Sequence, residues 1–309
     1  MNFDLKLESS GKLLNLELMA QQIVEGFNSG YHKSPFHGFS SEFEEHKIYN
    51  FGESTKHIDW KLFARSDKLH TKRFDDDTNL RCHFIIDNSA SMHYPTVTTK
   101  DLKTVNKLRF SVLSVASLMQ VLKKQRDAIG LSVFGTDYES FFTERGNSKH
   151  YYTLMSTLTK LYLGTPQKGQ TNTYKYLHEI SDKIHKRSLI VLFTDMFQSA
   201  VEDEKLFDAV RHLKFNKHEV IIFHVYDSKT EFNFEFINRP TKFIDTETGD
   251  SVDIFPNQIQ KKYTQKTKYY FRKIKLKCSQ YKINYVQSDV NEGFDNILKS
   301  LLISRQKIK

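Results

Sequence analysis

The feature that most constrains the fold is a regular alternation of buried strand segments and amphipathic helices that begins at residue 81. Three short segments are almost continuously apolar: RCHFIID (81–87), LIVLFTD (189–195) and EVIIFHVYD (219–227). Apolar runs of this length are typical of strands that are covered on both faces of a parallel sheet. The sequence therefore predicts an α/β fold with a mostly parallel sheet flanked by helices.

Further elements continue this alternation. The stretches AIGLSVFG, ESFFTE and KINYVQ predict three more strands. Apolar residues at helical spacing predict helices over 102–124, 148–162, 173–186, 202–214, 257–279 and 291–305. Sheets of this kind bind ligands at the carboxyl ends of their strands, where the strand order switches. Functional residues are therefore expected in the loops that follow the buried strands.

The first 80 residues lack this regularity. Residues 12–28 (KLLNLELMAQQIVEGFN) space their apolar side chains as an amphipathic helix does, whereas residues 29–80 mix short apolar stretches with turn residues. We therefore predict an N-terminal helix and irregular segment over 1–80, and an α/β domain over 81–309.

The composition is that of a globular protein. Of the 309 residues, 39% are hydrophobic and 27% are charged, as in ordinary soluble domains. No stretch approaches the roughly 20 apolar residues of a membrane-spanning helix. The N-terminus lacks the pattern of a signal peptide, so a cytoplasmic location is predicted. Cys82 and Cys278 are too few for a disulfide framework and fit reduced, buried thiols.

The net charge of +9 favours an acidic partner surface or nucleic acid. The stretch KKYTQKTKYYFRKIKLKCSQYK interleaves lysines with tyrosines, as proteins that bind single-stranded nucleic acid do. However, Ile259, Tyr263, Tyr270, Ile274 and Cys278 recur at helical spacing. This spacing directs the aromatic rings to the core and the lysines to a solvated face. Nucleic-acid binding through this basic C-terminal helix is therefore the alternative function and not the leading one.

Oxygen-bearing side chains follow two of the buried strands and occupy one predicted loop. FIID ends in Asp87 and continues as D-N-S-A-S, which supplies Ser89 and Ser91. LFTD ends in Asp195, and the loop sequence GQTNT carries Thr171 just before a helix. Because the carboxyl ends of parallel strands meet at one edge of a sheet, we expect these side chains to lie together.

A divalent cation suits this set of side chains. Mg²⁺ prefers oxygen ligands in near-octahedral geometry and gives up its water reluctantly. The hydroxyls of Ser89, Ser91 and Thr171 are neutral ligands that leave much of the ion's charge unquenched. Asp87 and Asp195 can hold metal-bound waters and orient the serines. The open sixth position predicts recognition of an Asp or Glu side chain of a protein partner, with Mg²⁺ as the ion and Mn²⁺ or Ca²⁺ as alternatives.

Other interpretations of these residues are less complete. Asp87 and Ser89 can cap a helix and Asp195 can end a strand at a turn, but this leaves Ser91 and Thr171 unexplained. A phosphatase with an aspartate nucleophile needs a second carboxylate where Ser89 stands.

Metal-assisted hydrolysis needs a general base, which the sequence does not place near the site. The sequence also lacks a phosphate loop and zinc-spaced Cys/His clusters, so we predict a binding protein and no enzyme.

Together, the three segments resemble the metal-ion-dependent adhesion site of von Willebrand factor A domains. That site combines D-x-S-x-S, a Thr in a G-x-T-N-T-like loop, and a T-D pair that ends a buried strand. All five positions carry the family's residue types, in the family's order. The resemblance implies a Rossmann-like von Willebrand factor A domain with a role in metal-dependent protein–protein interaction. Met196 stands where the family usually has glycine after the T-D pair, so the conformation of this turn requires a test.

The N-terminal part of the sequence carries a second, more specific resemblance. The strings SPFHGFSSEF, YNFG, HIDWKLFAR and TKRF are similar to the bacterial family catalogued as domain of unknown function fifty-eight, in which such segments precede a von Willebrand-type domain. The stretch 228–258 resembles the β-hairpin insertion of that family. The resemblance implies an association with MoxR-type AAA+ ATPases, and thus a role as a cofactor or adaptor of such an ATPase.

Within HIDWKLFAR, the side chains of Asp59, Trp60 and Arg65 predict a structural clamp. Trp60 would supply apolar area, Asp59 would accept hydrogen bonds, and Arg65 would offer several donors to a carboxylate. A docking surface for a partner is the alternative role of these three residues.

Overall fold

The structure is a computed structural model that describes most of the chain. The described residues are 16–30, 43–49, 58–66, 68–74, 80–96, 105–135, 138–165, 173–196, 200–245 and 249–308. The chain divides into two compact units, one formed by Met1–Phe27 with Leu80–Lys309 and the other by Asn28–Asn79.

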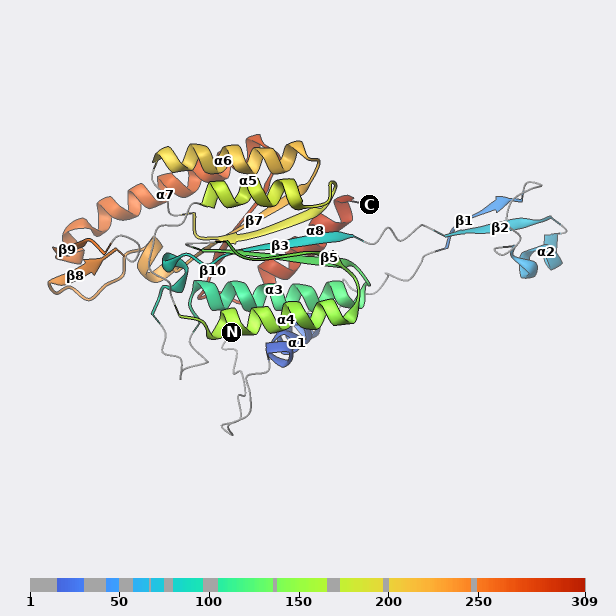
Figure 1. Cartoon of the computed structure of the whole chain (residues 1–309), viewed down its shortest axis with the longest axis horizontal. Coiled ribbons are helices and arrows are strands. Elements are labelled where there is room, and N and C mark those ends of the chain that lie inside the picture. The colour runs from blue at the N-terminus through green and yellow to red at the C-terminus, as the bar shows by residue number, and fades with distance from the viewer. Residues whose placement is uncertain are drawn as a thin grey trace. The chain divides into compact units, whose positions relative to one another are not determined.

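A six-stranded sheet forms the centre of the larger unit, with the strand order β10-β7-β6-β3-β4-β5 (Figure 1). The strands are β3 (Arg81–Asp87), β4 (Ala128–Phe134), β5 (Tyr138–Arg145), β6 (Leu189–Thr194), β7 (Glu219–Tyr226) and β10 (Asn284–Asp289). Every neighbouring pair is parallel except β4 with β5, which is antiparallel. The predicted α/β fold with a mostly parallel sheet is therefore confirmed.

Helices cover both faces of this sheet (Figure 1). One face carries α5 (Thr173–Lys183), α6 (Ala200–Phe215) and α7 (Pro256–Gln280), and the other carries α3 (Lys107–Lys124), α4 (Ser148–Leu163) and α8 (Asp295–Ile308). On the first face, Leu177, Val210 and Ile274 of the helices pack with Leu192 and Ile222 of the strands. This double cover explains why β3, β6 and β7 are buried along nearly their whole length. No helix in the described part of the chain is long and apolar enough to span a lipid bilayer.

The order of the strands switches between β3 and β6. From β3 the chain continues to β4 and β5 on one side, and then crosses to β6 and β7 on the other. Ile86 of β3 pairs with Phe193 of β6, so the next residues, Asp87 and Thr194, end two adjacent strands at the same level. Open α/β sheets bind ligands at such a switch point.

An insertion follows β7 at this same edge of the sheet. It begins with a π-helical turn (Ser228–Phe232) and contains an antiparallel hairpin of β8 (Thr241–Ile244) and β9 (Ser251–Ile254). Asp227, directly after β7, caps the turn, since its Oδ1 accepts hydrogen bonds from the backbone N–H groups of Lys229 (2.9 Å) and Thr230 (3.3 Å). The insertion therefore starts from a fixed point beside the ends of the central strands.

The first helix, α1 (Leu16–Gly30), joins the larger unit. Its buried side chains recur at helical spacing: Leu16, Met19, Ala20, Ile23, Val24 and Phe27. Glu17 at its start lies 3.6 Å from Nζ of Lys123 in α3. The sequence predicts that this helix belongs with the remainder of residues 1–80, whereas in the structure the boundary between the units falls after Phe27. The reason is that the apolar face of α1 is buried with the α/β unit.

The smaller unit contains α2 (Trp60–Ser66) and a two-stranded antiparallel sheet of β1 (Phe43–Ile48) and β2 (His70–Phe74). Asp59 caps α2, because its Oδ1 accepts hydrogen bonds from the backbone N–H groups of Lys61 (3.0 Å) and Leu62 (3.1 Å). Trp60 exposes 62% of its surface. The predicted clamp is therefore wrong for Trp60, since an exposed ring does not supply buried apolar area.

A buried hydrogen-bond network joins β3, β4 and β5. The side chain of His83 is fully buried, with its Nδ1 2.6 Å from Glu144 Oε1 and its Nε2 2.6 Å from Ser132 Oγ. Burial lowers the pKa of His83, so the neutral ring donates to Glu144 and accepts from Ser132. The order Ser132–His83–Glu144 is that of a hydrolase triad. However, Ser132 and His83 have no exposed surface, so the network joins strands and faces no substrate.

The charge of Glu144 stabilises this network. Burial alone would raise its pKa, but the hydrogen bonds from His83 and from His185 (2.8 Å) lower the pKa of Glu144 to about 2. A carboxyl group whose pKa is depressed by folding stabilises the folded state above its unfolded pKa, which is 4.5 here. That contribution is lost as the pH falls from 4.5 to about 2.

We predict that Glu144→Gln lowers the free energy of unfolding at pH 7 by about 2–3 kcal/mol, because two hydrogen bonds to a charged group are weakened. The difference between variant and wild type should shrink below pH 4.5, where the wild-type carboxylate also takes up a proton. Urea denaturation followed by circular dichroism between pH 7 and about pH 3 measures both effects. Glu219→Gln is the control, because Glu219 is an exposed partner of Lys214 and should contribute less than about 1 kcal/mol. A difference that does not vary with pH contradicts the prediction.

Candidate functional site

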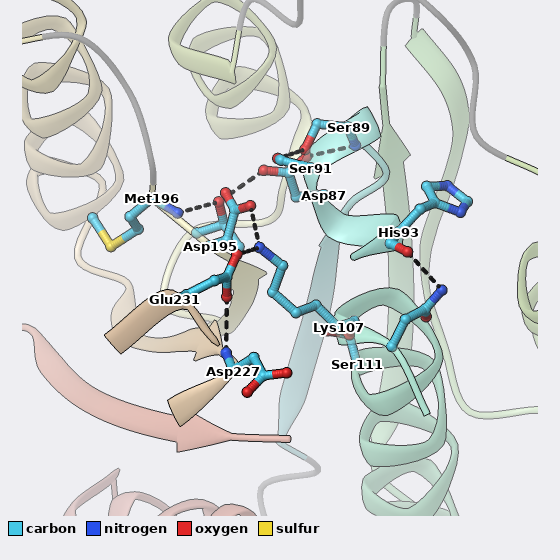
Figure 2. A network of polar contacts seen from close by, with 12 residues as sticks. Asp87, Ser89, Ser91, His93, Lys107, Ser111, Asp195, Met196, Asp227 and Glu231 are labelled. Carbon is cyan, nitrogen blue, oxygen red and sulfur yellow. Dashed lines mark hydrogen bonds and ion pairs between the residues drawn. The ribbon is translucent and has the colours of Figure 1, made fainter. Parts of the chain in front are cut away.

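Four of the five residues expected to hold a metal ion lie together at the switch point (Figure 2). Asp87 is the last residue of β3, and Asp195 directly follows β6. Ser89 and Ser91 belong to the loop and 3₁₀ turn after β3. Their Oγ atoms are 3.1 Å apart, and Ser91 also hydrogen-bonds the carboxylate of Asp195. Thr171, the fifth residue, lies outside the described residues.

Asp87 fixes the geometry of the first loop. Its Oδ1 accepts a hydrogen bond from the backbone N–H of Ser89 (2.9 Å), and its Oδ2 accepts one from Oγ1 of Thr194 (2.7 Å). The two-residue spacing from Asp87 to Ser89 thus closes a tight turn, and the threonine of the T-D pair connects β6 to β3. Asp87 has the orienting role that its position at the end of β3 suggests.

A buried lysine also enters the site. Lys107 is the first residue of α3 and has no exposed surface. Its Nζ donates to Oδ2 of Asp195 (2.9 Å) and to Oε1 of Glu231 (2.5 Å). Glu231 lies in the π-helical turn of the insertion, where its Oε2 accepts a hydrogen bond from the backbone N–H of Asp227 (2.8 Å). Figure 2 shows the ammonium group of Lys107 between these two carboxylates, so Lys107 connects the insertion to the end of β6.

The buried charges shift one another's pKa values. Burial first and the negative charge of Asp195 second raise the pKa of Asp87 to about 6. Burial also acts to raise the pKa of Asp195, but the ammonium of Lys107 and the hydrogen bond from Ser91 outweigh it, and the pKa is lowered. The two carboxylates likewise overcome the burial of Lys107 and raise its pKa. Asp87, Asp195 and Lys107 are therefore all charged at neutral pH.

The site carries more negative than positive charge. Among the described side chains that meet here, Asp87, Asp195 and Glu231 supply three carboxyl groups, and Lys107 supplies one ammonium group. Burial raises the pKa of Glu231, although the charge of Lys107 acts to lower it. The nearby His224 is neutral, because burial lowers its pKa to about 4. Among these described side chains the carboxyl groups thus outnumber the cation by two, in a buried environment where unbalanced charge is costly. One divalent cation would balance them.

The oxygen atoms present also fit such an ion. Two serine hydroxyls and two carboxylates are the ligand types that Mg²⁺ prefers. Across the described residues, no group of three or more His, Cys, Asp or Glu side chains is arranged to hold a metal ion. An ion at this edge would therefore need serine hydroxyls among its ligands, as the D-x-S-x-S sequence suggests.

Lys107 and Glu231 are not among the five site residues predicted from the sequence, although each leaves a signal there. A cation in the first turn of a helix opposes the helix dipole, so a lysine that begins a long apolar helix indicates an anion nearby. Glu231 follows the third buried strand by a few residues, and the rule that ligands bind at the carboxyl ends of strands applies to it as well. The sequence contains no indication that these two side chains meet.

Met196 adopts a left-handed backbone conformation, which glycine favours. Glycine is the usual residue at this position in the von Willebrand factor A domains that the sequence resembles. The φ of Met196, 52°, lies in the left-handed region, which costs a non-glycine residue roughly 1–2 kcal/mol. The side chain is 2% exposed and belongs to the core cluster under α5 and α6, where a buried methionine contributes about 2–5 kcal/mol. The backbone oxygen of Met196 also accepts a hydrogen bond from the hydroxyl of Tyr270. Packing therefore outweighs the backbone strain, and the turn after Asp195 is retained without glycine.

Comparison with known proteins identifies one family and several distant relatives. A family model described as "Protein of unknown function DUF58" matches residues 45–270. The uncharacterized proteins Mb1516 of Mycobacterium bovis and Rv1480 of Mycobacterium tuberculosis are each 23% identical to this chain over 149 residues. The matched region covers 48% of this chain and 45% of each relative, so the chain spans about half the length of the curated relatives it matches.

Solved structures with a similar arrangement are also distant. The crystal structure of an aerotolerance-related membrane protein from Bacteroides fragilis, with multiple mutations to serines, has a TM-score of 0.47 and 14% identity, and covers 74% of this chain and 99% of that chain. The PilB minor pilin from Streptococcus sanguinis has a TM-score of 0.43 and 10% identity, with coverage of 78% and 64%.

We predict that Lys107→Met lowers the free energy of unfolding by about 3–5 kcal/mol in the presence of EDTA, because Asp195 and Glu231 lose their buried cation. Adding Glu231→Gln to this variant should restore part of the loss, since one of the two uncompensated charges is removed. Urea denaturation of the single and double variants measures both effects. Lys149→Met is the matched control, because Lys149 also lies in the first turn of a helix but is exposed. A loss below about 1 kcal/mol for Lys107→Met would show that the ion pairs do not stabilise the fold.

Proposed function

The chain belongs to the DUF58 family of proteins of unknown function, and on that premise we propose that it is a non-enzymatic, metal-dependent protein-interaction module. In this proposal a divalent cation at the switch point binds a carboxylate of a protein partner, as in von Willebrand factor A domains. The observation that carries the proposal is that, among the described side chains, the buried carboxyl groups of Asp87 and Asp195 meet the hydroxyls of Ser89 and Ser91 at the switch point. Buried carboxylates are normally paired or coordinate a metal ion, and carboxylate and hydroxyl oxygens are the ligands that a hard divalent cation prefers.

The side chains divide into ligands and orienting groups. Ser89, Ser91 and Thr171 would provide neutral hydroxyl ligands to Mg²⁺, or to Mn²⁺ or Ca²⁺. Asp87 and Asp195 would orient the serines and hold waters of the ion. When bound, the ion supplies an electrophilic position that can accept a carboxylate oxygen from another protein.

A binding role suits the site better than catalysis does. The described titratable side chains at the strand ends are already engaged: Asp87 with Ser89 and Thr194, and Lys107 with two carboxylates. His93 donates a hydrogen bond from its Nε2 to Oδ1 of Asn88, and its pKa is lowered to about 4 by burial and by the charge of Arg109. A general base needs a pKa near neutrality and also a free position beside a substrate. The pKa of Asp87 is raised to about 6, but both of its carboxylate oxygens already accept hydrogen bonds.

The partner in this proposal is a MoxR-type AAA+ ATPase in the cytoplasm. The family resemblance suggests this partner, and the open position on the ion suggests an exposed Asp or Glu on it. The chain would then act as a cofactor or adaptor that brings the ATPase to its target.

One observation favours nucleic-acid binding as a second candidate. Helix α7 contains eight Lys or Arg residues and no Asp or Glu, and most of the basic side chains are exposed. Tyr269 on the same helix is 73% exposed, so a base can stack on it. Binding of this kind would depend steeply on salt and would not need a divalent ion.

We predict that the wild-type protein binds Mg²⁺ or Mn²⁺ and that Ser89→Ala with Ser91→Ala weakens this binding by at least about tenfold, which corresponds to 1.4 kcal/mol. Isothermal titration calorimetry measures the affinity, and the rise of Tm with ion concentration gives a second readout. The same tests apply to Thr171→Ala. Ser114→Ala is the control, because Ser114 is a buried serine of α3 that bonds the backbone oxygen of Phe110. Equal ion binding by wild type and double variant would falsify the assignment of the serines.

The partner is tested by capture of a purified MoxR-type ATPase from the same organism on the immobilised chain. We expect capture with Mg²⁺, none with EDTA, and none with the double serine variant. Fluorescence anisotropy with single-stranded DNA, with and without EDTA and over a range of salt, tests the second candidate. DNA binding that survives EDTA, together with no capture of the ATPase, would favour nucleic-acid binding and reject the proposed partner.

A further inference from the structure

A cavity of about 670 Å³ lies beside the candidate metal site. Ser91 and Tyr94, from the turn after β3, line the cavity on the side of the metal site, and Glu231 lines it from the π-helical turn. The hairpin of β8 and β9 contributes Ile244 and Val252, which are 61% and 54% exposed. The volume is within the range of about 300–1,000 Å³ that ligand pockets occupy. The cavity therefore has room for two large side chains.

Aromatic rings that already contact one another line this cavity. Phe243 stacks on Phe234 with ring centroids 5.4 Å apart, and it meets the ring of Phe236 edge-on at 4.9 Å. The ring of Tyr263, from α7, lies 4.5 Å from that of Phe234. Because these rings hold one another in place, an incoming side chain would not have to order them.

The charged groups at the cavity are acidic. Of the described residues that line it, Glu231, Asp245 and Asp250 are acidic, and none is Lys, Arg or His. Asp245 and Asp250 lie at the exposed end of the hairpin, where the backbone N–H of Asp245 donates to the oxygen of Asp250 (2.8 Å). Residues 228–255 contain three basic and six acidic residues, in a chain whose net charge is +9. The insertion is thus a local acidic surface on a basic protein.

We infer that the cavity receives a lysine or arginine side chain of a partner polypeptide, together with a bulky apolar side chain next to it. The alkyl stem of a lysine or arginine can lie along apolar rings while its charged end reaches a carboxylate. Aromatic faces attract the same cation. An acidic segment would instead meet Glu231, Asp245 and Asp250 with the same charge. The charge and the lining of the cavity therefore select one kind of partner segment.

This inference rests on the proposed function only in taking the occupant to be a protein. Ser91 lines the cavity and is also a candidate ligand of the metal ion. A partner can therefore place a carboxylate on the ion and a basic, apolar segment in the cavity at the same time. The two contacts use different chemistry and can be tested apart.

The test uses fluorescein-labelled, C-terminally amidated nonapeptides of Gly and Ser with a central Leu-Lys, Leu-Arg, Leu-Glu or Ser-Lys pair. Fluorescence anisotropy with the full chain is measured in EDTA, so that no metal-bridged contact contributes. We expect the Leu-Lys and Leu-Arg peptides to bind at least about tenfold more tightly than Leu-Glu and Ser-Lys. Raising the salt concentration should weaken their binding, because the carboxylates of the hairpin are exposed.

Exposed cavity residues provide variants that leave the core unchanged. Asp245→Asn with Asp250→Asn should remove the preference for Leu-Lys over Leu-Glu, and Ile244→Ser with Val252→Ser should remove the preference for Leu-Lys over Ser-Lys. Asp208→Asn on α6 and Ile303→Ser on α8 are the matched exposed controls and should bind as wild type does.

Three results would overturn the inference: equal affinity for all four peptides, no binding of any of them, or wild-type affinities in both cavity variants. Tight binding of N-acetyl-lysinamide alone, equal to that of the Leu-Lys peptide, would assign the cavity to a small amine and reject the polypeptide. Peptide binding without Mg²⁺ binding would reject the metal proposal alone. Mg²⁺ binding without peptide binding would reject the cavity inference alone.

Discussion

The buried ammonium group of Lys107 holds together the parts of the molecule that form the candidate site. It connects the first turn of α3 to Asp195 at the end of β6 and to Glu231 in the insertion. Without this cation, two buried carboxylates would face each other uncompensated. Yet among the described side chains one ammonium group faces three carboxyl groups, those of Asp87, Asp195 and Glu231, and such a set attracts positive charge. The proposed metal ion and the proposed cationic side chain in the neighbouring cavity both follow from this imbalance.

The central fold could be predicted because burial on two faces leaves a direct mark on the sequence. β3, β6 and β7 are continuous apolar runs, which are typical of strands in a parallel sheet with helices on both faces. The meeting of Asp87 with the serines and Asp195 was predictable for a related reason. Parallel strands align their carboxyl ends, and the strand order places β3 next to β6. Thr171 lies outside the described residues, so its position relative to these four stays a prediction.

Features that depend on long-range side-chain contacts could not be predicted. Lys107 and Glu231 are 124 residues apart, and no local pattern indicates that a lysine of α3 reaches a turn after β7. The packing of α1 on the larger unit depends on which surface its apolar face finds, which its periodicity alone does not specify. For Trp60 the prediction was wrong: its large apolar area suggests burial, but the side chain is exposed in the structure. An amphipathic pattern predicts that the apolar face of an element will be buried, but it does not predict which other element will pack on that face.

Glu231 belongs both to the Lys107 ion pair and to the wall of the cavity. A cation that enters the cavity and attracts Glu231 would compete with Lys107 for it, and the ammonium group would then interact more closely with Asp195. That change alters the electrostatic potential at Ser89 and Ser91. By thermodynamic linkage, an ion bound there would in turn change the affinity of the cavity by the same factor. Through this one shared carboxylate the two proposed sites would be energetically coupled, and binding at one would change the affinity at the other.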